Sequence, residues 1–532
     1  MKQLTLTLSA ALLTCAVFAQ HKNVLITNVS LPNEPSIMFN PKQPKYMVAG
    51  ANLSNYFYSS DSGKTWTAKT LTSSYGVWGD PTMIVDTTGA FYFFHLSNPS
   101  TGNWIDRIVC QKSTDKGQTY NDGSYMGLNG TKAQDKQWID VDRKRNIMYS
   151  TWTQFDAYGS TAATDSSHIL FSRSTDGGAT WSAAKRLDLV GGDCIDDDNT
   201  VEGAVPAVGP RGEVYVVWAA HQKLYFTKSL NGGSSFARPK VIGTQPGGWT
   251  YDIEGIQRCN GLPVTVCDCS NGPNKGTIYV NWTDQRNGAA NTDVWLIKST
   301  DGGKTWSQPI KVNNDNTTRQ QFLTWMSVDN VTGYLYFVFY DRRNTTGNAT
   351  DVYMARSKDG GKTFTNFKIS ETSFTPNAFL FFGDYTNLYA YNNVVRPIWC
   401  RMDRTTTSIY TALVNTSVIG KTTEPVAVQE QNTAAAKEEE TDNETAVLSA
   451  YPNPFSSVTY VSFAIHENTK VSVDIFDNNG KLVLSPIKNK EYSYGKYVEE
   501  IDFSKYDLPA GTYYMVITGG EEPERRKIIY TK

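Results

Sequence analysis

Short apolar segments that recur along residues 20–416 dominate the pattern of this chain. A typical unit is an apolar segment at Asp80–Asp86, a glycine at Gly89 and a second apolar segment at Phe91–His95. Segments of this length, rich in β-branched and aromatic residues and bounded by Gly and Asp, are typical of β-strands. The unit occurs seven times, and the other copies begin near Glu34, Gln137, Glu202, Gly261, Thr324 and Gly383. The pattern predicts an all-β fold built from repeated strand pairs.

A second motif, Ser-x-Asp-x-Gly-x-x-aromatic, lies between these units. Its six copies begin at Ser59, Ser113, Ser174, Ser229, Ser299 and Ser357. The Asp, replaced by Asn231 in the fourth copy, can bind nearby backbone N–H groups, and the glycine supplies a positive φ. We therefore interpret the motif as a structural turn. Six turns and seven inner strands predict a seven-bladed β-propeller, or alternatively a six-bladed one, whose N-terminal strand closes the ring.

The six motifs resemble the Asp-box repeats of the sialidase-like (BNR) propeller superfamily, and the resemblance covers roughly residues 21–416. It implies a propeller domain over residues 20–416 and, for true sialidases, an arginine triad with a Tyr nucleophile. The chain departs from that pattern. It has Glu34-Pro35-Ser36-Ile37 where the superfamily's Phe/Tyr-Arg-Ile-Pro motif would open the first blade. Sialic acid is therefore not the expected substrate.

The two ends of the chain carry export signals. Residues 1–19 combine Lys2, an apolar stretch and a small-residue cleavage site, which is typical of a secretory signal peptide. Residues 417–447 are acidic and lack aromatic residues, which predicts a flexible linker. Residues 448–532 resemble the C-terminal sorting domain of the type IX (Por) secretion system of Bacteroidetes, and a carbohydrate-binding β-sandwich is the alternative. The resemblance implies export across the outer membrane to the cell surface or the medium.

Charge and composition exclude several partners. The chain has 50 Lys and Arg against 52 Asp and Glu, which gives no strong field to attract nucleic acid or an anionic membrane. Beyond the signal peptide, no apolar run reaches the length of about 18 residues that a membrane span needs. We expect an exported monomer whose partners are an extracellular glycan or glycoprotein and, through residues 448–532, the type IX machinery.

Acidic residues are the best candidates for chemistry. They stand at the expected starts of inner strands, at one mouth of the channel, and comprise Glu34, Asp80, Asp135, Glu202, Glu254 and Asp384. Carboxyl groups that converge on one cavity can separate into a protonated acid and an ionised base, as glycoside hydrolysis requires. The catalytic candidates are Asp80, Glu202, Glu254, Asp384 and Tyr385. The alternative is that these acids only cap turns.

Aromatic residues near the same mouth are candidates for binding sugar rings. Trp78, Trp138 and Trp325, together with Glu34, form the predicted substrate-binding set. Core packing is the alternative role for all three tryptophans. The expected function is glycoside hydrolysis of extracellular glycans. The alternative is a non-catalytic propeller that binds a glycan or a protein at the same mouth.

One loop and six cysteines leave open questions. Asp193, Asp196, Asp197 and Asp198 gather oxygen ligands that could bind Ca²⁺ in an extracellular setting, although a solvated acidic loop fits equally well. No His or Cys pair has the spacing of a zinc site. The mature chain keeps six cysteines, namely Cys110, Cys194, Cys259, Cys267, Cys269 and Cys400. Their pairing does not follow from the sequence.

Overall fold

The computed structural model describes residues 21–378, 380–403, 405–420, 449–451, 453, 455–465, 468–477, 481–493, 495–519 and 524–531. The predicted signal peptide and residues 421–447 of the predicted linker lie outside these residues. In the described part of the chain, no helix has the length and apolar character needed to cross a membrane.

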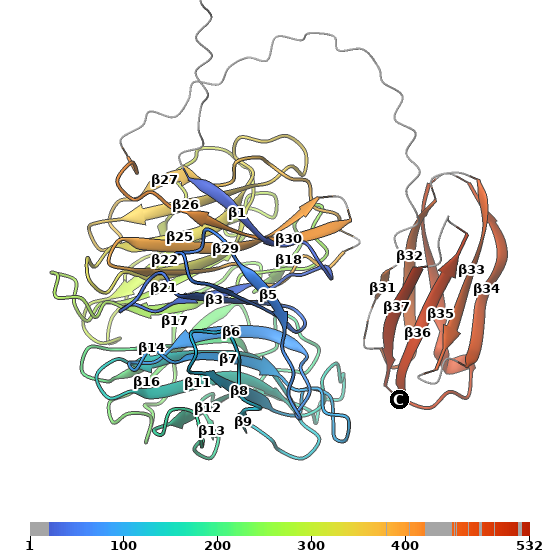
Figure 1. Cartoon of the computed structure of the whole chain (residues 1–532), viewed down its shortest axis with the longest axis horizontal. Helices are drawn as coiled ribbons and strands as arrows, with labels where there is room; N and C mark the ends of the chain where they lie inside the picture. Colours follow the sequence, from blue (N-terminus) through green and yellow to red (C-terminus); the bar gives the residue numbers. More distant parts are fainter. Residues whose placement is uncertain are drawn as a thin grey trace, which may run out of the picture.

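Seven four-stranded antiparallel sheets follow one another along residues 21–420 and form the blades of a propeller (Figure 1). The first three blades are β2 (Ser36–Phe39), β3 (Met47–Ala51), β4 (Asn55–Ser59) and β5 (Thr67–Thr70); β6 (Gly79–Val85), β7 (Phe91–Leu96), β8 (Ile108–Ser113) and β9 (Ser124–Met126); and β10 (Ala133–Asp142), β11 (Ile147–Phe155), β12 (Ser167–Ser174) and β13 (Lys185–Arg186). The next three are β14 (Glu202–Val208), β15 (Val214–Ala220), β16 (Lys223–Ser229) and β17 (Lys240–Thr244); β20 (Val264–Cys267), β21 (Ile278–Asp284), β22 (Asp293–Ser299) and β23 (Ile310–Lys311); and β24 (Gln321–Val328), β25 (Leu335–Asp341), β26 (Asp351–Ser357) and β27 (Thr365–Lys368). A small pair, β18 (Thr250–Tyr251) and β19 (Cys259–Asn260), lies in the connection before β20.

The seventh blade joins both ends of the propeller. It contains β28 (Asn387–Tyr391), β29 (Val394–Asp403), β30 (Thr406–Leu413) and, as its outer strand, β1 (Lys22–Thr27). Figure 1 shows β1 beside β30, and Lys22 pairs with Leu413 in an antiparallel register. The inner strand β28 contacts the inner strand β2 of the first blade, which closes the ring. The seven-bladed fold with N-terminal closure is thus confirmed.

The six repeated motifs are turns between the third and fourth strands of six blades. In the first, Asp61 Oδ1 accepts hydrogen bonds from the backbone N–H groups of Lys64 and Thr65, each at 3.0 Å, and Gly63 has a φ of 80°. Equivalent bonds lower the pKa of the Asp176 carboxyl in the third copy to about 2, because they outweigh its slight burial. The seventh blade has no such turn because its third and fourth strands come from opposite ends of the domain.

A β-bulge recurs at the start of four inner strands. The pairing register shifts between Gly79 and Thr82 in β6, and equivalent shifts occur in β10, β14 and β24. One bulge residue in each has a positive φ: Asp80 (51°), Lys136 (50°), Gly203 (73°) and Leu323 (48°). Glu34, just before β2, has a φ of 50°. Non-glycine residues adopt this conformation rarely, and such strain concentrates at functional sites.

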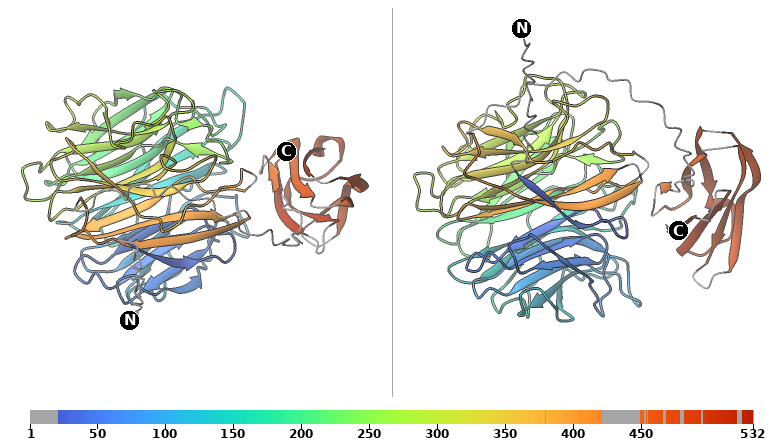
Figure 2. Two further views of the ribbon diagram at one scale, coloured as in Figure 1. Left: turned by 90° about the horizontal axis from the view of Figure 1, so that it is seen from above. Right: turned by 45° about the horizontal axis from the view of Figure 1, so that its top comes forward.

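The C-terminal residues form a separate β-sandwich (Figure 2). One sheet contains β31 (Ser449–Tyr451), β32 (Val458–Ile465) and β35 (Gly495–Asp502), and the other contains β34 (Leu482–Tyr492), β33 (Thr469–Phe476), β36 (Gly511–Thr518) and β37 (Glu524–Tyr530). A 3₁₀-helix, η1 (Phe503–Lys505), follows β35. Both sheets contribute to one core that includes Phe463, Val473 and Met515.

Candidate functional site

A buried lysine lies at the centre of the mouth at which the inner strands begin. The bulge of β10 directs Lys136 toward the channel, where its Nζ lies 2.6 Å from Asp384 Oδ2, 3.6 Å from Asp80 Oδ2 and 3.8 Å from Glu34 Oε1. These carboxylates precede three different inner strands or lie in their bulges, at β28, β6 and β2. Three predicted residues, Glu34, Asp80 and Asp384, therefore meet around one ammonium group.

A second cation joins the cluster from the connection that precedes β20. Arg258 Nε donates to Asp384 Oδ1 at 2.9 Å, and one of its terminal nitrogens donates to Asp196 Oδ2 at 3.1 Å. A further nitrogen binds Asp384 Oδ2. The Arg258 side chain is 39% exposed, whereas that of Asp384 is 3% exposed. Arg258 is thus the member of the cluster most accessible from the mouth.

Asp196 and Glu202 form a carboxyl pair beside Arg258. Asp196 Oδ2 also accepts a hydrogen bond from the Tyr158 hydroxyl at 2.7 Å. Glu202 is fully buried, and within the described residues neither of its oxygens accepts a hydrogen bond from an N–H or hydroxyl donor. Burial and the nearby Asp196 carboxylate both favour the protonated form of Glu202, since both raise its pKa.

The pKa values of the cluster separate into two groups. Burial, reinforced by neighbouring carboxylates, raises the pKa of Glu34 and of Glu202 well above the ordinary value, and burial does the same for Asp135. For Asp384 and Asp196 the effect of burial is outweighed by Arg258, and their pKa values fall below the usual range. Six carboxyl groups around two cations can be buried together only when some of them keep their protons.

Asp80 has one carboxylate oxygen that accepts no hydrogen bond within the described residues. Its backbone N–H donates to Asn52 Oδ1 at 2.7 Å, and the Asn52 amide nitrogen donates to Glu34, so one side chain fixes both neighbours. No hydrogen-bond donor in the described chain reaches Asp80 Oδ2, whose nearest cation is Lys136. The whole Asp80 residue is 8% exposed.

Aromatic residues close the channel beneath the cluster. The rings of Trp138 and Trp325 lie 4.2 Å apart between centroids, and Tyr385 packs against Trp138 at 5.1 Å. Burial and nearby carboxylates raise the pKa of Tyr385 well above its ordinary value. A cavity of about 20 Å³, lined by Lys136, Asp384 and these rings, lies beside the cluster and has room for one water molecule. Trp138 and Trp325 form the floor of the charged mouth. This arrangement corresponds to core packing, the alternative to binding a sugar ring.

The rim of the mouth carries a row of rings that includes the predicted Trp78. Trp78 contacts Trp104 edge-to-face at 5.7 Å, and Trp104 contacts Tyr158 at 5.4 Å. All three side chains are partly exposed. Because Tyr158 also binds Asp196, this row leads from the rim to the charged cluster.

Glu254 lies away from its expected place at the start of an inner strand, and the acidic residues within 193–198 lie in one loop but bind different partners. Glu254 is exposed in the connection between β18 and β19, ten residues before β20, and not at the start of an inner strand. Asp193 binds the Thr200 hydroxyl at 2.8 Å and Asp198 binds the Thr250 N–H at 2.8 Å, while Asp196 belongs to the cluster. Asp197 Oδ1 accepts from the Asn199 N–H at 3.2 Å. Within the described ranges, no group of three or more His, Cys, Asp or Glu side chains could hold a metal ion.

The six cysteines of the propeller are free thiols in this structure, and all but Cys269 are buried. Two residues at the centre of the site, Lys136 and Arg258, were not singled out by sequence reasoning. Lys136 occupies the bulge position that holds Asp80 in β6, so an alignment of the repeats would have found it. Arg258 lies in an irregular connection without a repeat equivalent, and no signal in the sequence marks it.

Comparison with known proteins confirms the predicted sorting domain. Residues 449–531 match the family described as the secretion system C-terminal sorting domain. The domain implies handling by the type IX secretion machinery and export across the outer membrane to the cell surface or the medium. No curated protein matches the chain.

The propeller resembles several solved structures at low identity. A protein of unknown function from Dyadobacter fermentans has 12% identity and a TM-score of 0.43, covering 63% of this chain and 96% of that one. The α-L-arabinofuranosidase Arb93A from Fusarium graminearum has 13% identity and a TM-score of 0.42, with coverages of 76% and 99%. The NanB sialidase from Streptococcus pneumoniae has 9% identity and a TM-score of 0.42, with coverages of 70% and 84%. At this level the likeness describes the fold and carries no information about activity.

Proposed function

We propose that the charged mouth catalyses the hydrolysis of glycosidic bonds in extracellular glycans. The observation that supports this function best is the convergence of Asp80, Asp196 and Glu202 with two cations at one mouth, where the pKa of Glu202 is raised and that of Asp196 is lowered. Glycosidases need one carboxylic acid to protonate the leaving oxygen and one carboxylate to attack or to activate water. Environments that push carboxyl pKa values apart assign these two roles.

The Asp196–Glu202 pair is the proposed general acid. Glu202 is fully buried, whereas the Asp196 side chain is 10% exposed and faces Arg258 and Tyr158. A proton shared by the pair can therefore be delivered through Asp196 to the oxygen of the leaving group, as the bond from the anomeric carbon to that oxygen breaks. When Asp80 acts as the nucleophile, the pair regains its proton from the water that cleaves the bond between the sugar and Asp80; when Asp80 acts as the base and takes the proton of that water, the pair regains its proton from solvent.

Asp80 is the proposed partner carboxylate. Its Oδ2 has no hydrogen-bond donor within the described residues, so it is the oxygen best able to attack the anomeric carbon or to accept a proton from water. Asp384 is less suited to this role because Lys136 and Arg258 both hold it. We assign Asp384 to positioning the two cations, and Lys136 to fixing the Asp80 carboxylate in place.

The non-catalytic alternative also has an observation in its favour. The ionised carboxylates are already bound by cations, and the residues Glu34, Asp80, Asp135, Glu202 and Asp384 are each at most 8% exposed. A closed charge cluster of this kind could stiffen the mouth of a protein that binds a glycan through Arg258 and the rim aromatics without cleaving it.

The two functions are separated by measuring product release from a panel of neutral and acidic glycans with the exported chain. We expect Asp80→Asn to lower release by at least about a hundredfold, the usual contribution of a positioned acid or base. Release should also fall as the pH rises through the raised pKa of Glu202, and this limb should be absent in Glu202→Gln. Glu254→Gln, the same carboxyl-to-amide change on the exposed connection, should leave release unchanged.

Binding of a glycan without release, and without an effect of Asp80→Asn on affinity beyond a fewfold, would refute hydrolysis and support the non-catalytic alternative. Equal loss of activity in Asp80→Asn and Glu254→Gln would refute the assignment of the site to the Lys136 cluster.

A further inference from the structure

The end of the channel opposite the charged mouth contains a large pocket. It has a volume of about 690 Å³, and all seven inner strands contribute to its lining. The Trp138–Trp325 pair forms its floor and separates it from the cluster around Lys136. Pockets that hold small molecules have volumes of about 300–1,000 Å³. The size is therefore that of a ligand site.

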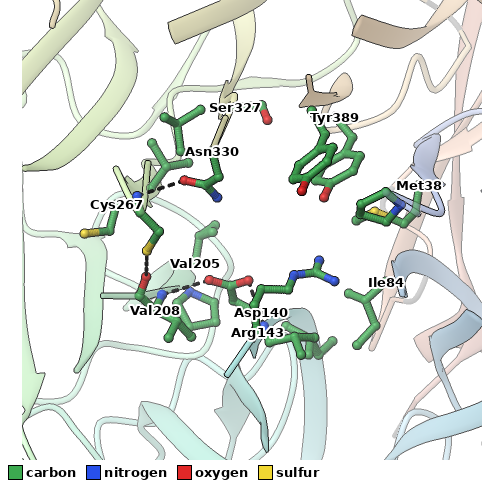
Figure 3. Close-up of a pocket in the computed structure, with 18 of the residues that line it drawn as sticks. Met38, Ile84, Asp140, Arg143, Val205, Val208, Cys267, Ser327, Asn330 and Tyr389 are labelled. Atoms are coloured by element: carbon green, nitrogen blue, oxygen red, sulfur yellow. Dashed lines mark hydrogen bonds between the residues drawn. The ribbon is translucent and has the colours of Figure 1, made fainter. Parts of the chain in front are cut away.

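Apolar side chains form part of the walls of this pocket, beside polar ones. Figure 3 shows Met38, Ile84, Val205 and Val208 around the opening, contributed by β2, β6 and β14. Tyr389 from β28 adds a ring that packs against Phe39 at 4.7 Å between centroids. A ligand that fills the pocket must therefore present an apolar body to these walls.

The rim carries four cations that form no ion pair within the described residues, although the charge of Arg143 acts on the nearby Asp140 carboxyl and lowers its pKa against the effect of burial. Lys42, Arg143, Lys144 and Lys275 all line the pocket and are exposed. Within the described part of the chain none makes an ion pair: the three lysines donate to the oxygens of Thr87, Pro210 and Asn271. Arg143 donates from one terminal nitrogen to the Val85 carbonyl at 2.7 Å, and its guanidinium extends into the opening in Figure 3.

The acids of the same rim are bound by groups of the protein. Asp86 accepts hydrogen bonds from three backbone N–H groups of its own turn and from the Tyr92 hydroxyl. Asp142 pairs with Arg145 at 2.7 Å. Asp140 accepts from the N–H groups of Val208 and Val141, and burial raises its pKa. The four cations of the rim outnumber the two carboxyl groups that form no ion pair among the residues that the structure describes, Asp86 and Asp140, so the net charge at this end is positive.

We propose that this pocket binds a small amphipathic carboxylate, with its apolar body between the inner strands and its carboxylate at Arg143. The chemistry recognised is a single anionic group on an aliphatic chain, as in a medium-chain fatty acid. Apolar walls bury the chain, and the planar guanidinium offers two parallel N–H donors to a carboxylate. This site is independent of the proposed hydrolysis, because the tryptophan floor separates the two ends of the channel.

Binding can be measured on the exported chain by displacement of anilinonaphthalene sulfonate, a fluorescent apolar anion, with monomeric dodecanoate. We expect dodecanoate to displace the dye and dodecanol, which lacks the charge, to bind about tenfold more weakly. Arg143→Met keeps the aliphatic stem and should remove this preference for the acid. Lys362→Met, at an exposed turn between β26 and β27, is the matched control and should change nothing.

The orientation of the ligand provides a second test. A dodecanoate with bromine at its methyl end should quench tryptophan fluorescence, because bromine quenches rings that it contacts and the chain should end at the Trp138–Trp325 floor. The quenching should fall in Trp138→Phe. Val266→Trp, which fills the pocket from β20, should abolish dodecanoate binding while the circular dichroism spectrum stays native.

Three outcomes would overturn the proposal. These are failure of dodecanoate to displace the dye, an unchanged preference of Arg143→Met for the acid over the alcohol, and binding to anionic lipid vesicles but not to monomeric dodecanoate. The last result would indicate a membrane surface site rather than a pocket for a free carboxylate. Retained binding in Val266→Trp would place the ligand elsewhere on the chain.

Discussion

Replacement of Lys136 by Met tests whether one ammonium holds the charged mouth together. The substitution keeps most of the side-chain length but removes the charge that lies 2.6 Å from Asp384 and within 3.8 Å of Asp80 and Glu34. Removal of one partner from a buried ion pair costs about 3–5 kcal/mol, because the remaining charge stays desolvated. Arg258 still contacts Asp384, so we expect a loss of about 3 kcal/mol in the free energy of unfolding at neutral pH.

The loss should depend on pH in a defined direction. Folded Glu34 already binds its proton more tightly than in the unfolded chain, and Lys136 is the group that opposes this. Without Lys136, Glu34 should take up a proton at higher pH, so lowering the pH stabilises the folded variant relative to its unfolded chain. The difference from the unsubstituted protein should therefore be smaller at mildly acidic pH than at mildly alkaline pH. Asp384 keeps its contact with Arg258, which continues to lower its pKa.

Tryptophan fluorescence during denaturant unfolding measures this effect in the full chain. All 13 tryptophans lie between Trp66 and Trp399, so the signal reports on the propeller and not on the sorting domain. Lys132→Met is the matched control: Lys132 lies 2.6 Å from Asp156, but the two side chains are 37% and 23% exposed. Such a pair contributes at most about 1 kcal/mol. If Lys136→Met shifts unfolding no more than Lys132→Met, or shifts it equally at both pH values, the cluster is not held by Lys136.

Three further predictions concern protonation, the repeated turns and the thiols. Glu202→Gln should change the free energy of unfolding at neutral pH by less than about 1 kcal/mol, because an amide resembles the protonated carboxyl. Asp384→Asn should cost about 3 kcal/mol or more, because it removes the carboxylate that Lys136 and Arg258 share; denaturant unfolding compares the two variants. Asp359→Ala removes bonds to two backbone N–H groups and two hydroxyls of its turn and should cost about 1–2 kcal/mol in a thermal melt. An alanine at the neighbouring Lys358 is the control, and no loss is expected from it. An alkylating reagent should label Cys269 first in the native protein and all six thiols after unfolding, as counted by mass spectrometry; fewer than six would reveal a disulfide.

The repeated pattern of the sequence was sufficient to predict the architecture. Each turn motif ends in an aromatic residue, such as Trp66 or Trp306, that packs against a nearby hydrophobic cluster of the propeller. Every copy of the motif therefore marks the outer edge of one blade. The missing seventh motif and the unpartnered strand before Glu34 predicted that the two ends would share a blade. These features are local and periodic, and local signals survive in the sequence without knowledge of distant contacts.

The site was predicted less completely because its contacts are not local. Asp80, Glu202 and Asp384 could be proposed from their positions at strand starts, but the cations that hold them come from other segments. Arg258 meets Asp384 across 126 positions of sequence. Glu254 was counted as a strand start because the small β18–β19 pair precedes the true inner strand β20. Because this connection is irregular, the spacing between the repeated units does not give the start of β20.

The recurring bulge explains why carboxyl groups converge at one end of the channel. In an uninterrupted strand, side chains alternate, so Asp135 and Trp138, three positions apart, would face opposite sides. In β10, however, Asp135 pairs with Thr153 and Trp138 pairs with Thr151, which are two positions apart on the neighbouring strand and share a face. The extra residue thus turns Asp135 to the channel side with Trp138, and the same shift in β14 places Glu202 on the side of Val205. The positions of Asp135 and Glu202 at the mouth therefore depend on a backbone feature that β10 and β14 share.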